Sequence, residues 1–343
     1  MKNDQMKGMV NVMRKITAIV LSIILLSFIP AAFAETENLK QIIFCLDWTP
    51  NTNHTGVYAA DALGYYRDEG LDVQIVQPPE NGAVLMCASN QAQFAVDAQD
   101  TMAASLDLEE PLNITAVATI LQHNTSGILT RAEDGITSAK GLEDRIYSTW
   151  DSPVELAMLR YCVEKEGGDF SKVKLIPNNI TDEPAALRAH QTDAVWIFYG
   201  WSGINAELSD VACGYWDFAS LSPELDYYTP VILANNDFLQ NDPETAKAFL
   251  KATAKGYQYA SEHPEEAAEM LIAGDSTGAL EDSRELVYAS QKWLSERYIA
   301  DAPAWGNIAP ERWNGFYGWL YENGLTVHDL RGKGFSNDYL PGE

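Results

Sequence analysis

The chain has 343 residues, of which 46% are hydrophobic, so it is long enough for two domains with their own cores. It carries 49 Asp and Glu against 23 Lys and Arg, a formal net charge of −26 at pH 7. A surface this acidic argues against nucleic acid and anionic lipid as partners, and its simplest consequence is solubility.

The first 34 residues have the pattern of a secretory signal peptide. Basic Arg14 and Lys15 precede the apolar run 16–29, and Ala32-Phe33-Ala34 is a small-x-small cleavage site. The apolar run is shorter than the about 20 residues of a membrane-spanning helix. We therefore predict a signal peptide over 1–34, with 1–12 as an N-terminal extension, and an exported protein at the periplasmic or extracellular face of the membrane.

The mature chain opens on a β-loop-α-β unit. The near-continuous apolar run 41–46 is typical of a strand buried on both faces of a parallel sheet. The polar stretch 46–56, LDWTPNTNHTG, follows, and then come a helical segment ending at Gly64 and a second strand at 71–76. The polar stretch thus lies at the carboxyl end of a strand, where open α/β sheets bind ligands.

The side chains of this stretch suit a flat, polar, nitrogen-rich small molecule. Trp48 offers a planar apolar face, and His54, Asn51 and Asn53 offer both hydrogen-bond donors and acceptors. We predict Thr55 as the cap of the following helix, with the first helical N–H groups facing the loop. A Pro-Asn turn with Trp48 in the core is the alternative that the residues leave open.

The β/α rhythm continues through the middle of the chain. Strand 93–98 ends near Asp97, and strand 113–121 leads to the polar segment 122–127, which contains Asn124 and is our first crossover between lobes. Strand 146–149 is followed by Trp150 and Asp151 and by a helix from Pro153 that Ser152 caps, with Glu155 in its first turn near the mouth of the site. This repeats the layout around Trp48, and two such units facing each other would clamp a ring.

A second group of aromatic residues follows strand 194–198. Tyr199 and Trp201 lie past the strand end, where a ligand could stack, whereas at least one aromatic residue of 196–201 belongs to the core. The segment 225–230, which includes Tyr228, precedes a returning strand at 231–234 and is our second crossover. Amphipathic helices are predicted at 243–262, 264–272, 281–299 and 310–323, and we assign them structural roles.

Neither the cysteines nor the common catalytic motifs identify a function. Four Cys in an exported chain permit two disulfides with three connectivities, or buried free thiols, and their spacing argues against zinc. There is no G-x-S-x-G elbow, phosphate loop or G-x-G-x-x-G fingerprint, and the five His are scattered. A pair of carboxylates for glycoside cleavage stays open, because any two of 49 acids could converge.

Several segments together resemble a known family. Besides 46–56, these are GYYRDEGLDV at 64–73, QHNTSG at 122–127, AVWIFYGW at 194–201 and LDYYTP at 225–230. They resemble the substrate-binding proteins of ABC importers that carry thiamine pyrimidine precursors, a family that is also similar to the eukaryotic hydroxymethylpyrimidine phosphate synthases.

The resemblance implies an α/β, two-lobed, periplasmic-binding-protein-like fold of type II, with a ligand cleft between lobes joined by two crossovers. Lobe 1 would comprise 36–127 and 231–343, and lobe 2 would comprise 128–230. The implied partners are a pyrimidine ligand, hydroxymethylpyrimidine or formylaminopyrimidine, and an importer permease; we expect a monomer with no cofactor and no metal. The candidate ligand-binding residues are Trp48, Asn53, His54, Asp97, Asn124, Trp150, Asp151, Glu155, Tyr199, Trp201 and Tyr228.

Roles follow from side-chain chemistry. Trp48, Tyr199, Trp201 and Tyr228 would stack on the ring, Asn53, His54 and Asn124 would bind ring nitrogens or substituents, and Asp97, Asp151 or Glu155 would accept from an exocyclic amine. The same family architecture also carries riboflavin, alkanesulfonates, taurine or nitrate. Anionic ligands would call for Lys or Arg, which these loops lack, whereas riboflavin stays open as an alternative.

The similarity to the synthases raises the alternative that this chain is an enzyme. They have a histidine that matches His54 and a cysteine-rich catalytic segment, but this chain reads Asp226-Tyr227-Tyr228-Thr229-Pro230 before its returning strand. An export signal would also separate the protein from cytosolic pyridoxal phosphate. We therefore expect a binding protein and no enzyme, with an exported pyrimidine-acting enzyme as the alternative.

Overall fold

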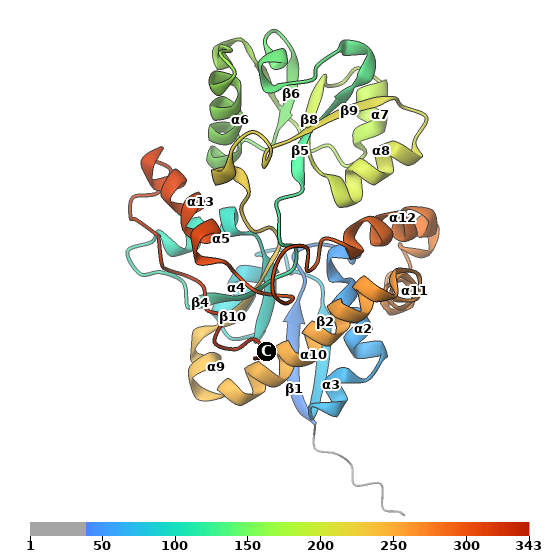
Figure 1. Cartoon of the computed structure of the whole chain (residues 1–343), viewed down its shortest axis with the longest axis vertical. Helices are drawn as coiled ribbons and strands as arrows, with labels where there is room; N and C mark the ends of the chain where they lie inside the picture. Colours follow the sequence, from blue (N-terminus) through green and yellow to red (C-terminus); the bar gives the residue numbers. More distant parts are fainter. Residues whose placement is uncertain (1–38, 343) are drawn as a thin grey trace, which may run out of the picture. The chain divides into compact units, whose positions relative to one another are not determined.

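The computed structural model describes residues 39–342 of the chain. The predicted signal peptide and its extension lie outside these residues. The described part forms two α/β lobes, each built on a five-stranded sheet flanked by helices (Figure 1). The predicted two-lobed α/β fold is confirmed.

The sheet of the first lobe has the strand order β2-β1-β3-β10-β4. Strands β1 and β2, and β1 and β3, run parallel, whereas β10 runs antiparallel to both of its neighbours. The strands are β1 Lys40–Cys45, β2 Leu71–Val76, β3 Phe94–Asp97, β4 Ile114–Thr119 and β10 Val231–Asn235.

The sheet of the second lobe has the order β7-β6-β8-β5-β9 and the same arrangement of directions, with β5 antiparallel to both neighbours. Its strands are β5 Ser126–Arg131, β6 Ile146–Thr149, β7 Lys174–Pro177, β8 Ala194–Phe198 and β9 Cys213–Asp217. In each sheet the antiparallel strand follows directly on a crossover from the other lobe. The lobe boundaries at 127/128 and 230/231 stay predictions, and β5 begins at Ser126.

The helices lie in chain order between these strands. The first lobe has η1 Thr52–His54, α2 Thr55–Ala62, α3 Tyr65–Asp68, α4 Ala83–Ala88, α5 Gln99–Leu106, α9 Asn236–Asn241, α10 Pro243–Glu262, α11 Pro264–Gly274, η7 Glu281–Ser283, α12 Arg284–Ser295 and α13 Pro310–Glu322. The second lobe has η2 Ala132–Asp134, η3 Ala139–Leu142, α6 Pro153–Lys165, η4 Phe170–Lys172, α7 Glu183–Arg188, η5 Tyr199–Gly203, α8 Ile204–Leu208 and η6 Pro223–Leu225.

The core of the first lobe forms where α10 packs on the sheet. The ring of Phe249 stacks on Phe94 at a centroid distance of 4.0 Å, and Tyr66 stacks on the same ring at 5.3 Å. Helices α2 and α10 approach closely at two glycines: a Cβ on Gly256 would lie 1.9 Å from the carbonyl oxygen of Gly56. Glycine at this position therefore sets the distance between the two helices.

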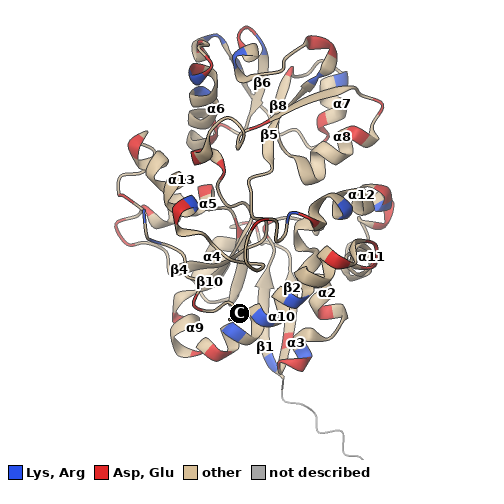
Figure 2. Cartoon of the chain, in the orientation of Figure 1, with Lys and Arg blue, Asp and Glu red and all other residues tan. Residues whose placement is uncertain are grey.

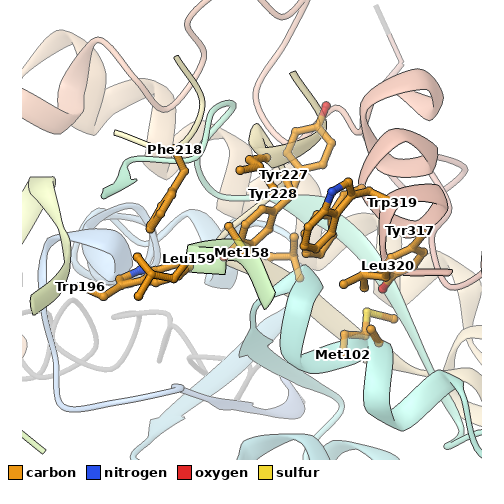
Figure 3. Close-up of a cluster of buried hydrophobic side chains, with 14 of the residues drawn as sticks. Met102, Met158, Leu159, Trp196, Phe218, Tyr227, Tyr228, Tyr317, Trp319 and Leu320 are labelled. Atoms are coloured by element: carbon orange, nitrogen blue, oxygen red, sulfur yellow. The ribbon is translucent and has the colours of Figure 1, made fainter. Parts of the chain in front are cut away.

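A second hydrophobic cluster continues from one lobe into the other. Figure 3 shows Leu159 and Trp196 of the second lobe in one group with Tyr227 and with Trp319 of α13. Tyr227 stacks on Phe316 of α13 at 4.1 Å. Helix α13 thus packs on the second crossover and on the second lobe, in addition to the first.

The structure also shows where the charged residues lie and which state the cysteines have. Acidic residues are spread over the helices of both lobes (Figure 2), and Lys251 on α10 pairs with Glu69 at 2.7 Å. All four cysteines are free thiols, and three of them are buried. Of the two predicted alternatives, disulfides or buried free thiols, the structure therefore has the free thiols. Within residues 39–342, no helix has both the length and the apolar character that crossing a bilayer requires.

Candidate functional site

The two crossovers join the carboxyl edges of the two sheets. In the first sheet, Cys45 pairs with Ala95 in parallel register, which puts Asp47 and Asp97 side by side two residues further on. Strand β10 enters the same edge, because Val231 lies opposite Asp97. In the second sheet β5 enters at the carboxyl end of β8, where Ser126 lies opposite Phe198. The polar loops predicted as ligand-binding therefore occupy the two edges between which the crossovers run.

Trp48 is exposed at the edge of the first sheet. Its side chain is 67% accessible, so the alternative in which it packs in the core is wrong. The loop that carries it is held by a capping box: the Asn51 side chain accepts from the backbone N–H of Asn53 at 2.9 Å, and Nδ1 of His54 accepts from the backbone N–H of Asn51. The indole is thus presented on an ordered loop. The side chain of Asn53 is half-buried beside it.

His54 is fully buried, and both of its ring nitrogens are hydrogen-bonded within the protein. Its Nδ1 accepts from the backbone N–H of Asn51 at 3.2 Å, and its Nε2 lies 2.8 Å from Oδ1 of Asp47. Because Nδ1 accepts, the proton is on Nε2, which donates to Asp47. The predicted ligand contact of His54 is corrected to a positioning role for Asp47 and the loop.

The predicted cap of the following helix is wrong. Thr55 is the first residue of α2, with His54 at the N-cap position, and its hydroxyl donates to the carbonyl oxygen of Thr52 at 3.0 Å. The reason is that the 3-10 turn η1 precedes α2, so that capping begins at Asn51 instead.

Three carboxylates gather at this edge. Oδ1 of Asp97 accepts from the hydroxyl of Thr101 at 2.5 Å, whereas Oδ2 is buried and has no hydrogen-bond partner within the described chain. Burial, with Asp100 and Asp47 nearby, raises the pKa of Asp97 to about 7. Burial also raises the pKa of Asp100 to about 6. Near neutral pH the Asp97 carboxyl therefore exists in both forms, and its protonated form can donate one hydrogen bond and accept another.

Trp150 and Asp151 lie at the edge of the second sheet. The indole of Trp150 is 46% exposed and contacts Trp196 at a centroid distance of 5.7 Å. Trp196 itself is buried beside Phe218, which confirms that at least one aromatic residue of 196–201 belongs to the core. Asp151 is exposed and has a positive φ of 62°, a conformation that Asp tolerates better than most residues.

Glu155 is buried behind Trp150. Its carboxylate accepts from the Tyr147 hydroxyl at 2.7 Å, from the Thr149 hydroxyl at 2.8 Å and from the backbone N–H of Trp150 at 3.1 Å. Together with Ser152 it forms the capping box of α6, as the sequence predicts for Ser152. The predicted ligand contact of Glu155 is corrected to an internal role: it holds the loop that carries Trp150.

The remaining aromatic candidates are less exposed. Tyr199 is half-buried, with Tyr215 at 4.7 Å and Trp293 at 5.1 Å from its ring, and its hydroxyl donates to Glu207. Trp201 packs against the hydrophobic core of the first lobe. Tyr228 is fully buried and its hydroxyl accepts from the backbone N–H of Ala309 at 2.9 Å. Stacking of a ligand on Tyr228 is therefore corrected, because neither face of the ring is free.

Asn124 ties the two crossovers together. Its Nδ2 donates to the carbonyl oxygen of Leu225 at 2.9 Å, its Oδ1 accepts from the backbone N–H of Ser126 at 2.8 Å, and its own N–H donates to Asp226. The buried side chain is satisfied by the protein, so its predicted ligand contact is corrected to a structural one. His123 beside it lies between Asp226 and Asp301, and the bond to Asp226 raises the pKa of His123.

Two residues of this region were not among the predicted set. Asp97 is the last residue of β3 and Asp47 lies two residues past the end of β1, so the rule that selected Asp97 would also have found Asp47. Trp293 lies on α12, a helix predicted to have a structural role only, and nothing local in its sequence indicates the contact with Tyr199. Within residues 39–342 no group of His, Cys, Asp and Glu has an arrangement that could hold a metal ion.

Comparison with known proteins finds relatives that are named as binding proteins and relatives that are named as synthases. It is 27% identical over 313 residues to a formylaminopyrimidine-binding protein of Halalkalibacterium halodurans, a match that covers 89% of this chain and 92% of the relative. It is 24% identical over 238 residues to the 4-amino-5-hydroxymethyl-2-methylpyrimidine phosphate synthase THI11 of Saccharomyces cerevisiae, covering 65% of this chain and 68% of the relative.

Among solved structures, the fold is similar to that of the periplasmic aliphatic sulphonate binding protein SsuA from Escherichia coli. The TM-score is 0.63 at 13% identity, with 84% of this chain and 89% of that chain covered. The expected periplasmic-binding-protein-like fold is confirmed. Residues 51–267 match the model of the NMT1/THI5-like family, and because that match covers more than half of the chain, the protein belongs to this family.

Proposed function

We propose that this chain is the extracytoplasmic substrate-binding protein of an ABC importer and that it binds a thiamine pyrimidine precursor, formylaminopyrimidine or hydroxymethylpyrimidine. The similarity over most of the chain to a formylaminopyrimidine-binding protein supports this ligand class. The two-lobed fold that it shares with periplasmic binding proteins supports the transport role.

The observation that carries the proposal is a pair of exposed indoles at opposing edges. Trp48 follows the first strand of one sheet, and Trp150 follows the equivalent strand of the other. Exposed tryptophans are uncommon on a soluble surface, and two that extend from facing strand ends suit a flat ring between them. Tyr199, whose ring lies 5.1 Å from that of Trp293, would extend this aromatic surface.

Asp97 is our candidate for hydrogen bonding to the polar edge of the ring. An aminopyrimidine presents an amine donor beside a ring nitrogen that accepts, and a protonated carboxyl offers the complementary acceptor and donor. The buried, unpartnered Oδ2 of Asp97 and its pKa of about 7 fit this pairing. Asp47, Asp151 and Asn53 are candidates for the remaining polar substituents.

The charge at the two edges disfavours an anionic ligand. The loops 46–56, 97–101, 120–127, 149–152, 198–203 and 225–230 contain no Lys or Arg. Arg312, which lies near the second crossover, already faces Asp226 at 3.5 Å. A sulfonate or nitrate would thus meet carboxylates without a free cation in these loops. Similarity to a sulphonate-binding protein supports the fold alone.

We further propose that the chain binds its ligand without converting it. The relatives named as synthases belong to the same family, so that membership alone does not separate the two roles. In this chain the segment before β10 supplies buried Tyr227 and Tyr228 and the crossover residue Asp226, and it contains no cysteine. An exported monomer with a permease as its partner fits this reading.

Calorimetric titration and a thermal-shift panel test the proposal. The panel contains formylaminopyrimidine, hydroxymethylpyrimidine, riboflavin and an alkanesulfonate. A ligand at 100 times its Kd stabilises the folded state by about 2.7 kcal/mol, so a specific binder raises the melting temperature clearly. We expect a response to the pyrimidines, none to the sulfonate, and unchanged ligand by mass spectrometry. Consumption of the pyrimidine would replace the binding role with an enzymatic one, and a response to riboflavin alone would replace the ligand.

A further inference from the structure

Besides the packing of α13 on the second lobe, the two lobes meet where the turn η5 of the second lobe contacts helix α12 of the first. Ser290 of α12 lies at the centre of this contact and is fully buried. Its hydroxyl donates to the carbonyl oxygen of Gly200 in η5, and it lies 2.5 Å from the hydroxyl of Thr52 in η1. One serine thus touches the loop after β1 and the loop after β8.

The direction of these two hydrogen bonds is fixed by chemistry. A carbonyl oxygen only accepts, so the single proton of Ser290 goes to Gly200, and Thr52 must donate its own proton to Ser290. The carbonyl oxygen of Thr52 in turn accepts from the hydroxyl of Tyr298 at 2.6 Å. The result is a buried relay from Thr52 through Ser290 to Gly200, in which each hydroxyl proton has one partner.

Close packing surrounds the relay. A Cβ on Gly200 would lie 2.8 Å from Cδ2 of Leu294, so any larger residue in the turn would require Leu294 to shift. Trp201 packs on the core of the first lobe, and Tyr199 contacts Trp293. The contact is therefore a fitted interface between the lobes, with the relay in its interior.

The relay joins two of the loops to which our proposed function assigns ligand contacts, the loop of Trp48 and the loop of Tyr199. Thr52 lies in the same 3-10 turn as Asn53 and His54, four residues after Trp48, and Gly200 directly follows Tyr199. We propose that Ser290 is a positioning residue of the ligand site: through Thr52 and Gly200 it sets the separation of the two ligand loops and stabilises the lobes in the arrangement that binds ligand. This inference rests on the proposed function for its ligand, but not for the interlobe contact.

The test compares Ser290→Ala with Ser295→Ala. Ser295 lies on the same helix, and its hydroxyl donates to the carbonyl oxygen of Lys292 within that helix, so this control removes a hydroxyl without touching the second lobe. Small-angle X-ray scattering of the ligand-free proteins measures the separation of the lobes. Calorimetry and stopped-flow kinetics with formylaminopyrimidine measure Kd and the dissociation rate.

We expect Ser290→Ala to have a larger radius of gyration than the wild type and the control, and a Kd weaker by about threefold to tenfold, mainly through faster dissociation. Scattering and binding equal to those of Ser295→Ala would overturn the inference. If the wild type bound no pyrimidine, the proposed function would fail, whereas the ligand-free scattering would still decide the role of Ser290.

A second variant approaches the contact from the other lobe. Gly200→Ala adds a methyl group against Leu294, a residue of the first-lobe core, and should separate η5 from α12. We expect the same increase in radius of gyration and the same loss of affinity as for Ser290→Ala. If Ser290→Ala fails to fold, this variant decides, and wild-type scattering with wild-type affinity would overturn the inference.

Discussion

Substituting Asp97 by Asn should stabilise the protein at alkaline pH. The folded state raises the pKa of this carboxyl from 3.8 to about 7, chiefly because it is buried. The folded protein therefore holds a proton at pH values where the unfolded chain has released it. Stability contributed by the neutral acid is complete below about pH 4, falls as the pH rises, and is lost above about pH 7.

The magnitude follows from the shift. About three pKa units correspond to about 4 kcal/mol between the two protonation states. Asn has the shape of the neutral acid and keeps an oxygen to accept from Thr101, so it avoids the buried charge. We expect Asp97→Asn to equal the wild type near pH 4 and to exceed it increasingly up to pH 8, with about 4 kcal/mol as the ceiling.

Urea unfolding followed by circular dichroism at pH 4, 6 and 8 measures this difference. Asp151→Asn is the matched control, because the exposed Asp151 lies at the opposing edge and its substitution should change the free energy of unfolding by less than about 0.5 kcal/mol. A constant difference between Asp97→Asn and the wild type across this range, or a less stable variant at pH 8, would refute the assignment of a buried carboxyl with a raised pKa.

Four further outcomes are expected. Calorimetry between pH 6 and 9 should show that affinity for the pyrimidine falls about tenfold per pH unit above about pH 7, because only protonated Asp97 donates to the ring, and Asp97→Asn should remove this slope; a flat wild-type profile would contradict the pairing. Trp48→Ala and Trp150→Ala should each weaken binding by about tenfold to a hundredfold and leave the melting temperature nearly unchanged, since both indoles are exposed; a matching loss of stability would point to structural roles instead. Glu155→Ala should lower the free energy of unfolding by about 2 to 3 kcal/mol, because the buried Tyr147 hydroxyl loses its acceptor, and urea melts that match the wild type would disprove its internal role. Gly256→Ala should destabilise by about 2 to 3 kcal/mol through its clash with Gly56, whereas Gly315→Ala on α13, where a Cβ meets nothing within 4 Å, should not; equal melts for the two would argue against the close helix contact.

The fold was predictable wherever apolar runs are bounded by strong local signals. Strand β8 and helix α10 have the predicted bounds, because a buried apolar run defines the first and Pro243 begins the second. Strand β9, Cys213–Asp217, was not predicted: it is an edge strand that pairs only with β5, and Gly214 in its interior weakens the local signal for a strand.

The site was predictable only as a set of loops. Topology puts polar residues at strand ends, but whether a side chain faces outward depends on partners far away in the sequence. Trp48 is exposed and Tyr228 is buried, although both are aromatic residues in polar loops. Glu155 has an ordinary position for a ligand-facing acid, yet Tyr147 and Thr149 take its oxygens. The bond from Ser290 to Gly200 joins residues 90 positions apart, for which no local pattern exists.

The most direct test of the account is a crystal structure of the protein with formylaminopyrimidine. We predict the ring between the indoles of Trp48 and Trp150, with its amine and neighbouring ring nitrogen bonded to Asp97. A pyrimidine bound away from both tryptophans, or a bound anion held by Lys or Arg at these strand ends, would contradict the account.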